Sequence, residues 1–373
     1  MNRLLLLPLI IACSALFTIA SAEPRFAVRT GDKCQSCHVD PAGGGMRQTL
    51  GVQYGRDELP CPALSKEYEM EDFSNVITNV LGVGADFRTL YYAQEQPSST
   101  ATNRFLQMQG DLYLNLHVSK KVSIFLRKGL YDSPSAPAVG FEAYGLFNIL
   151  PASGHIKVGR FTPNYGTRLD DHTSFIRLYT GFAADLGPER TGVEASVSPG
   201  PFTFTGGISN AEENQTLAVT NEKGLLGRAE GMFKLSERAA LGLGGNVFTK
   251  VVDSVRSTFY GGFGSISVNG VTLLGETDWI RSASEKVGAT PAVTGLAVYG
   301  EGDVVLTQGV EFTLAYDFYD PDISLKTGTR SRYTFGFAVF PLGGVELRPM
   351  FRLHDDTNTG KWNELDLILH LYI

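Results

Sequence analysis

Apolar and polar residues alternate along most of the chain from about residue 74 to the C-terminus. In the last segment, every second residue from Leu365 to Ile373 is aliphatic, and most of the residues between them are polar. The same period recurs at 111–118, 310–318 and 345–354. A period of two is that of a β-strand with one apolar and one polar face. We mark sixteen such segments, which predicts an all-β fold.

The connectors between these segments differ in length in a regular way. Short turns are predicted at 119–120, 151–154, 198–201, 235–238, 269–270, 307–309 and 341–344. Longer polar connectors lie between them, at 94–103, 132–138, 162–189, 210–223, 282–291, 320–330 and 355–361, and only 252–255 is brief. A soluble β-sandwich also alternates apolar and polar residues. The alternation of short and long connectors favours instead an antiparallel transmembrane barrel of about sixteen strands, with short periplasmic turns and long external loops.

The first residues have the features of an export signal. Arg3 precedes an apolar run over 4–20, and Ala20, Ser21 and Ala22 form a cleavage pattern of small residues. A membrane anchor and a lipoprotein site at 11–13 are weaker alternatives, because a cleavage site directly follows the full run. We therefore expect a signal peptide over 1–22, an N-terminal segment and linker over 23–72, and a barrel over 73–373 in the outer membrane.

Composition narrows the classes of partner. The formal net charge of −7 argues against nucleic acid as a partner. The chain has four cysteines, of which Cys13 lies in the expected signal, so the protein is not a disulfide scaffold. Cys61, between two prolines, has no assigned role.

Cys34, Cys37 and His38 form a Cys-x-x-Cys-His motif, the attachment signature of c-type haem. Two thiols three positions apart can form thioethers to one porphyrin, and the next histidine then becomes the proximal iron ligand. A Cys34–Cys37 disulfide and half of a zinc site are the alternatives. The motif predicts one covalent haem c, and because the segment is too short for a globular cytochrome, the barrel must cover it.

The sixth iron ligand has four candidates. Met46 follows a run of three glycines, which could fold the chain back over the haem. His117, His155 and His370 each fall on the polar side of a strand near its periplasmic end. The alternatives are an ordinary apolar contact for Met46 and rim positions for the histidines.

Charged residues of both signs fall on the inward faces of the predicted strands. They are Arg127, Glu194, Arg228, Glu230, Glu276, Asp278, Glu301, Asp303, Glu311, Arg348, Arg352 and Asp366. Such residues either select ions or form ion pairs that hold a wet lumen together. The connector at 162–189 is the longest, and its charges and aromatic residues predict that it folds inward as a constriction.

The motif, followed directly by a porin-like barrel, resembles the fused monohaem cytochrome–porins of bacterial outer membranes, which include the outer-membrane cytochromes of iron-oxidising bacteria. The end of the chain is similar to the terminal signal of barrels inserted into that membrane, although those usually end in Phe and this chain ends in Ile373. The resemblance implies haem held by Cys34, Cys37 and His38, and electron transfer between an external donor or acceptor and a periplasmic c-type cytochrome.

Three functions therefore compete. The first is electron transfer across the outer membrane, which makes the protein an electron carrier rather than a catalyst. The second is a porin in which the haem segment is a plug or redox sensor. The third is peroxidase chemistry at a five-coordinate haem, which ranks last because the sequence places no His–Arg pair beside the iron.

Overall fold

A computed structural model describes residues 24–68, 74–97, 101–130, 140–183, 187–213, 221–286, 291–325 and 327–373. The expected signal peptide, residues 1–22, lies outside this range. No helix among the described residues is long and apolar enough to cross a membrane.

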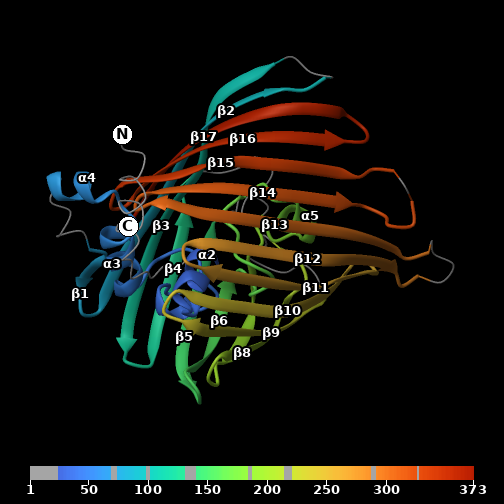
Figure 1. The fold of residues 1–373 in the computed structure, drawn as a ribbon. Coiled ribbons are helices and arrows are strands. Elements are labelled where there is room, and N and C mark those ends of the chain that lie inside the picture. The colour runs from blue at the N-terminus through green and yellow to red at the C-terminus, as the bar shows by residue number, and fades with distance from the viewer. Residues whose placement is uncertain are drawn as a thin grey trace, which may run out of the picture.

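Sixteen long strands, β2 to β17, form one antiparallel barrel (Figure 1). Their bounds are β2 Leu81–Glu95, β3 Thr102–Ser119, β4 Val122–Gly129, β5 Phe141–Leu150, β6 Gly154–Phe161, β7 Arg190–Val197, β8 Phe202–Asn210, β9 Lys223–Ser236, β10 Ala239–Val252, β11 Val255–Val268, β12 Val271–Ser284, β13 Val293–Thr307, β14 Val310–Asp320, β15 Arg330–Leu342, β16 Val345–Asp356 and β17 Gly360–Tyr372. Each strand pairs with the next in sequence. β17 pairs with β2, from Tyr372 opposite Asp86 to Asn363 opposite Glu95, and this closes the ring. The predicted fold class is confirmed.

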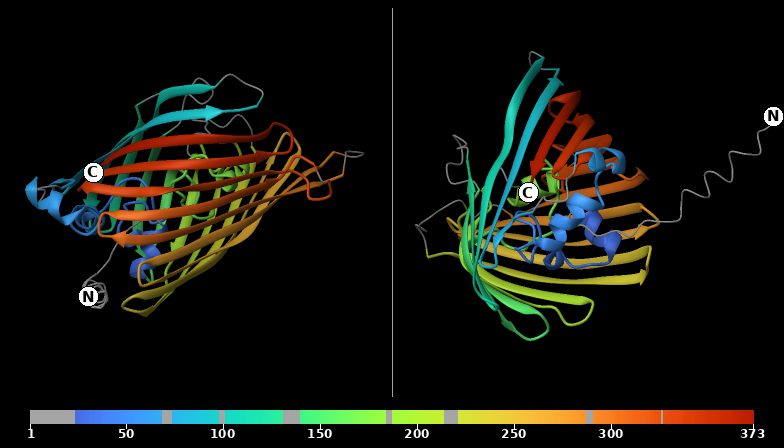
Figure 2. Two further views of the ribbon diagram at one scale, coloured as in Figure 1. Left: turned by 45° about the horizontal axis from the view of Figure 1, so that its top comes forward. Right: turned by 90° about the vertical axis from the view of Figure 1, so that its left-hand side faces the viewer.

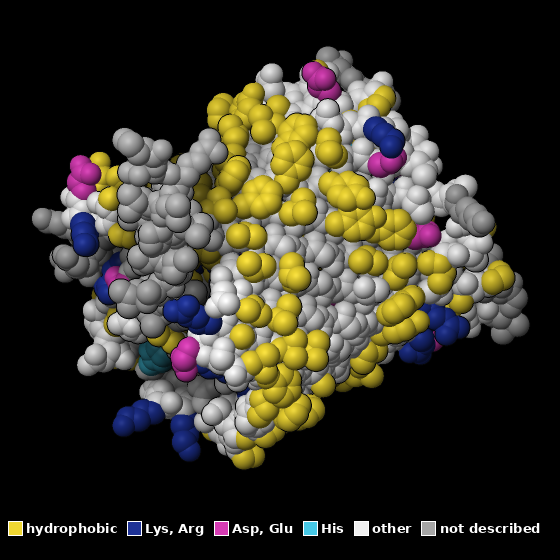
Figure 3. All heavy atoms as spheres, in the orientation of Figure 1, with side chains coloured by type: hydrophobic (Ala, Val, Ile, Leu, Met, Phe, Trp, Pro, Cys, Tyr) yellow, Lys and Arg dark blue, Asp and Glu magenta, His cyan; other side chains and the backbone are white. Residues whose placement is uncertain are grey.

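The alternation of residue types sorts the side chains onto two faces. Leu365, Leu367, Leu369 and Leu371 are exposed on the outside of β17, whereas Asp366 on the same strand is buried inside. Hydrophobic side chains cover much of the visible outer wall, and most of the charged ones lie toward its ends (Figure 3). A wall with a solvent-excluded polar interior and an apolar exterior is the arrangement that a barrel in lipid requires.

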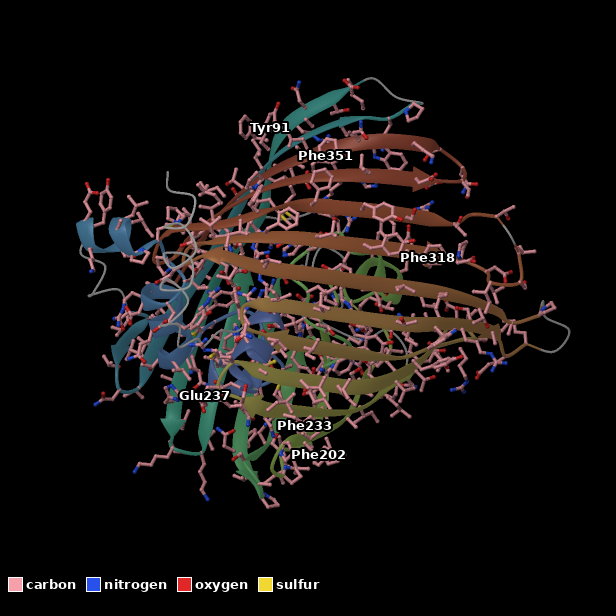
Figure 4. All side chains as sticks on the ribbon, in the orientation of Figure 1. Tyr91, Phe202, Phe233, Glu237, Phe318 and Phe351 are labelled. Carbon is pink, nitrogen blue, oxygen red and sulfur yellow. The ribbon has the colours of Figure 1, made fainter. Side chains whose placement is uncertain are left out.

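Aromatic pairs lie along the outer wall toward the strand ends. Phe202 and Phe233 lie near the tight turn that carries Glu237, with their ring centroids 5.6 Å apart (Figure 4). On β2, Tyr91 pairs with Phe105, whose side chain is 76% exposed. Aromatic residues of this kind mark the membrane–water boundary of transmembrane barrels.

The N-terminal segment lies at the barrel end that carries the short turns, and we call residues 24–68 the plug. It contains α2 (Pro24–Thr30), the 3₁₀ turn η1 (Cys34–Ser36), α3 (Thr49–Asp57) and α4 (Pro62–Glu67). Seen along the barrel, α2 and α3 lie within the outline of the ring of strands (Figure 2, right), whereas α4 projects beyond the strand ends (Figure 1). A short strand, β1 (Val76–Thr78), then pairs with the start of β2.

The long connector between β6 and β7 folds inward, as predicted. Its helix α5 (Phe175–Thr180) lies against the inner wall at β12, β13 and β14. Ile176 is fully buried in a cluster with Leu274 and Tyr299. We call the described part of this connector, residues 162–183 and 187–189, the constriction loop.

One predicted loop is shorter than expected. The polar stretch 355–361 reads as a long connector, but Asp355 pairs with Lys361 and Asp356 with Gly360 in the ladder between β16 and β17. Only residues 357–359 connect the two strands. The polar side chains reflect the position of these strand ends beyond the apolar band, where water replaces lipid.

Candidate functional site

The Cys-x-x-Cys-His motif forms one compact turn inside the plug. The backbone N–H groups of Cys37 and His38 both donate to the carbonyl oxygen of Cys34, at 3.1 and 3.0 Å. Cys34, Cys37 and Cys61 are all free thiols. Among the described residues, no group of three His, Cys, Asp or Glu side chains is arranged so that it could hold a metal ion. The structure therefore contains neither the alternative disulfide nor a zinc site in that part of the chain.

Both thiols of the motif are hard to ionise. Burial, together with the negative charge of Glu230, raises the pKa of Cys34 to about 12. Burial, together with Asp32, raises the pKa of Cys37 to about 11. The two side chains are consequently held as neutral thiols at physiological pH.

The chain after the motif turns back on itself through Gly43, Gly44 and Gly45. Their φ angles of 88°, 78° and 62° lie in the left-handed region that only glycine adopts without strain. The turn brings Arg47 opposite His38 in an isolated antiparallel bridge. A side chain at position 43 would also approach Cys34 Sγ to 3.3 Å. The glycine run thus lets the chain pass close to the motif.

Three cavities surround this turn, and the predicted site residues are divided among them. The thiol cavity is lined by Cys34 and His155, among others. The methionine cavity is lined by Met46 and His117. The histidine cavity is lined by His38 and His370. Of the four distal candidates, only His370 shares a cavity with His38.

Met46 packs as an apolar side chain. It is buried with Val39, Tyr113 and Phe125 in a hydrophobic cluster on the inner wall. A Cβ at Gly82 on β2 would lie 2.8 Å from Met46 Cε, so this glycine makes room for the side chain. His117, by contrast, is exposed at the end of β3, with its Nε2 3.2 Å from the side-chain amide of Asn115.

His370 lies between two acidic side chains. Its Nδ1 is 3.0 Å from Glu346 Oε2, and its Nε2 is 3.0 Å from Asp86 Oδ1. All three residues are buried. The imidazole therefore has a carboxylate on each ring nitrogen and joins β17 to β16 and β2.

The histidine cavity has the chemical character that a haem requires. Its wall contains the aromatic side chains of Phe26, Tyr54, Tyr113, Phe125, Phe340 and Tyr372. It also contains the guanidinium groups of Arg47, Arg88, Arg127 and Arg168. A macrocycle is apolar, whereas its propionates are acids that arginine binds well. His38 would supply a nitrogen ligand from this cavity, and Cys34 would supply a covalent link from the adjoining thiol cavity, which shares Gly43 and Arg168 with it. With Cys37 as the second link, these residues fit the group.

The constriction loop adds a residue that the sequence did not single out. His172 lines the histidine cavity, and its Nε2 lies 3.4 Å from Arg88 Nη1. The sequence placed no His–Arg pair beside the haem motif, but the folded loop brings one to this cavity. His172 sits in irregular backbone, where no strand periodicity assigns a side chain to a face.

Buried ion pairs hold the plug against the inner wall. Arg25 lies 3.4 Å from Asp303, and Arg29 donates to Glu311 through both terminal nitrogens, one of them at 2.9 Å. Lys33 donates to the carbonyl oxygens of Gly200 and Phe202, each at 2.9 Å. The spacing of Arg25 and Arg29, one turn apart on α2, is a signal that sequence reasoning missed.

Further contacts extend around the ring. Asp40 of the plug pairs with Lys157 on β6 at 3.0 Å, and Arg47 lies 3.5 Å from Asp86 on β2. The plug therefore reaches acidic or basic partners on both sides of the lumen.

The constriction loop is fixed in the same way. Asp170 pairs with Arg88 and Arg348, and Asp171 lies 2.7 Å from Arg332. On α5, Arg177 pairs with Glu276 and lies 3.7 Å from Asp278. Many of the predicted lumen charges are thus in ion pairs, which agrees with the stabilising role rather than with open rings of charge.

The comparisons with known proteins concern the barrel. No protein-family model and no curated protein matches the chain. Among solved structures, an anion-selective porin from Comamonas acidovorans is similar at a TM-score of 0.57 and 11% identity, over 79% of this chain and 99% of that one. The outer-membrane channel DcaP of Acinetobacter baumannii gives 0.57 and 13%, over 81% and 100%.

OmpT of Vibrio cholerae, an outer-membrane protein, gives a TM-score of 0.58 and 10% identity, over 80% of this chain and 100% of that one. Identities this low show the fold alone. The chain therefore has the closed sixteen-stranded antiparallel barrel of the outer-membrane porins.

Proposed function

We propose that the protein is an outer-membrane barrel of the channel type whose periplasmic mouth is closed by its own N-terminal segment. The observation that carries the proposal is the set of buried ion pairs between the plug and the inner wall, above all those of Arg25 and Arg29 with Asp303 and Glu311. The similarity to solved porins and channels supports the barrel part. This similarity concerns the barrel and gives no support for haem binding.

The plug and the constriction loop close the lumen at two different levels. The plug crosses the end with the short turns, and the loop narrows the lumen beyond it. Because both are attached by charged groups that water or ions can also solvate, their attachment can be weakened without unfolding the strands. With both segments attached, the channel has a low basal conductance.

Single-channel recording in planar bilayers tests this function. We expect the wild-type protein to conduct little, and the Arg25→Gln/Arg29→Gln variant to show larger and longer openings. Lys361→Gln is the matched control, because Lys361 is an exposed cation at the opposite end that pairs with Asp355 across a surface turn. A wild-type protein that conducts like an open porin, with no effect of the double variant, would refute the plug.

Electron transfer is the second candidate, favoured by the Cys-x-x-Cys-His turn beside a cavity lined with aromatic and arginine side chains. Cys34 and Cys37 would hold haem c covalently, with His38 as an axial ligand, and the bound haem would supply one-electron chemistry. The residues of the barrel wall and the plug that line this cavity would surround the group and set its orientation. A periplasmic c-type cytochrome would be the partner.

A haem stain on denatured outer-membrane fractions tests this second candidate separately. The protein must be expressed with c-haem maturation and compared with a Cys34→Ala/Cys37→Ala variant. We expect a covalent signal in the wild type that disappears in the variant. A wild type without covalent haem would leave the plugged channel as the function.

A further inference from the structure

Three of the six histidines line the histidine cavity, namely His38, His172 and His370. His117 and His155 line other cavities. His354 stacks on Trp362 at the far end of β16, and the centroids of the two rings are 4.5 Å apart. His172 and His370 are therefore the histidines that share a cavity with His38 and can offer a second imidazole there.

His370 is poorly placed to bind a metal. Both of its ring nitrogens face carboxylates at 3.0 Å, and Asp86 and Glu346 are buried. Ligation of iron by either ring nitrogen would break one of these two contacts between buried groups, and the loss of a hydrogen bond to a buried charged group destabilises a fold even where that group has other partners. The geometry assigns His370 to the closure of the barrel instead.

His172 is held in position by its neighbours in sequence. Asp171 lies 2.7 Å from Arg332 and 3.3 Å from Arg352, and the Thr173 hydroxyl accepts hydrogen bonds from the same two arginines at 2.7 and 2.6 Å. These arginines come from β15 and β16. The backbone on both sides of His172 is consequently fixed to the wall, which presents the imidazole to the cavity without loop freedom.

The contact with Arg88 shows which form of the ring faces the cavity. A guanidinium can only donate a hydrogen bond, so the imidazole Nε2 at 3.4 Å must present its lone pair. A lone pair on a neutral imidazole is what a metal ligand provides. Arg88 also pairs with Asp170 and donates to the Asp170 carbonyl oxygen at 3.1 Å, so it keeps partners if Nε2 turns to a metal.

We propose that His172 is the second axial ligand of a haem attached at Cys34 and Cys37, with His38 as the first. The proposal rests on the electron-transfer candidate above. Such ligation would also connect two segments that the plug proposal treats separately. Iron bound by both residues would join the plug, which carries His38, to the constriction loop, which carries His172.

The test uses full-length protein made with c-haem maturation and purified in detergent. Wild-type protein is expected to give the spectrum of a six-coordinate low-spin haem. The His172→Ala variant is expected to become high-spin, with a shifted Soret band, and free imidazole should restore the low-spin spectrum. His172→Met should stay six-coordinate with a higher reduction potential, because a thioether raises the potential relative to imidazole.

The control variant is His370→Gln, which should keep the low-spin spectrum even if it weakens the barrel. The different gel mobility of folded and heat-denatured barrels reports whether each variant is folded. Covalent haem whose spectrum is unchanged in His172→Ala, or lost in His370→Gln, overturns the assignment of His172 alone. Absence of covalent haem from the wild type overturns the electron-transfer candidate and this inference with it.

Discussion

The ammonium group of Lys157 lies 3.0 Å from Asp40 Oδ1, although Lys157 belongs to strand β6 and Asp40 to the plug. Lys157 also lies 3.2 Å from Glu194 on β7 and has no exposed surface. One buried cation therefore serves two acids from different parts of the molecule. Lys157 therefore links the wall strands β6 and β7 to the part of the plug that carries Asp40.

Replacing Lys157 by Met is expected to weaken plug docking by about 3–5 kcal/mol, because it leaves two buried carboxylates without their shared cation. Chymotrypsin cleavage of the plug in folded protein measures this, since cleavage follows the population of the undocked state. Lys121→Met, at an exposed tight turn, is the control. Equal cleavage rates in the two variants would mean that the Lys157–Asp40 pair contributes little.

Plug docking is expected to weaken in acid. Burial raises the pKa of Asp40, but Lys157 and Arg168 outweigh it, and the pKa lies below the usual value of an aspartate. A carboxyl group whose pKa is lowered on docking stabilises the docked form above its free pKa, and this stabilisation is lost as the pH falls through the docked pKa. Channel openings should therefore become more frequent below about pH 4.

The variant Asp40→Asn isolates this contribution. It should show more openings at neutral pH and a flatter response to acid than the wild type. If its acid response matched that of the wild type, other carboxylates would govern the opening.

The haem-free protein should react slowly with thiol reagents at its motif. Because burial raises the pKa of Cys34 to about 12 and of Cys37 to about 11, few thiolates exist at neutral pH. In a Cys61→Ser background, the rate of alkylation by iodoacetamide should still be rising at about pH 10. The same protein unfolded in urea provides the reference. Fast alkylation of the folded protein at pH 7 would show that the thiols are not buried.

Met46→Ala is expected to destabilise the docked plug by about 2–5 kcal/mol, the usual cost of truncating a buried Met. Met46 is 3% exposed and packs against Val39 and Tyr113. Protease protection of the plug reports the loss, and Met46→Leu should restore most of it. A haem spectrum that changed in Met46→Leu while protection stayed normal would instead assign Met46 a role at the iron.

The strands were predictable because lipid and water impose opposite preferences on alternate residues. Leu365 and Asp366 differ in this way: the apolar side chain faces the exposed outside of the barrel and the acidic one is buried inside. The motif at Cys34, Cys37 and His38 is local in sequence, so the turn that it forms could also be predicted. The extent of the 355–361 connector was not, because polar residues occur both in loops and at strand ends above the membrane.

The attachment of the plug could not be derived from the sequence. Arg25 meets Asp303 only because the ring brings together residues that are 278 positions apart. His172 was missed for a related reason. Its direction depends on four wall arginines and the acids beside it, among them Arg332 with Asp171, and no periodicity in the loop records those contacts. The distribution of the predicted site residues among three cavities was also out of reach. It depends on how side chains pack around Gly43 to Gly45, and the spacing of residues in the sequence does not record that packing.

The closing pair of strands has a consequence for the order of assembly. Arg47 of the plug lies 4.1 Å above the ring of Tyr372 and 3.5 Å from Asp86, so it touches both the last strand and the first. Tyr372 and Asp86 become neighbours only when β17 joins β2. The seat for Arg47 is therefore complete only after β17 has paired with β2. An enzyme that modifies the buried Cys37 must consequently reach it while the plug is undocked, either before this seam closes or after the plug has left its seat.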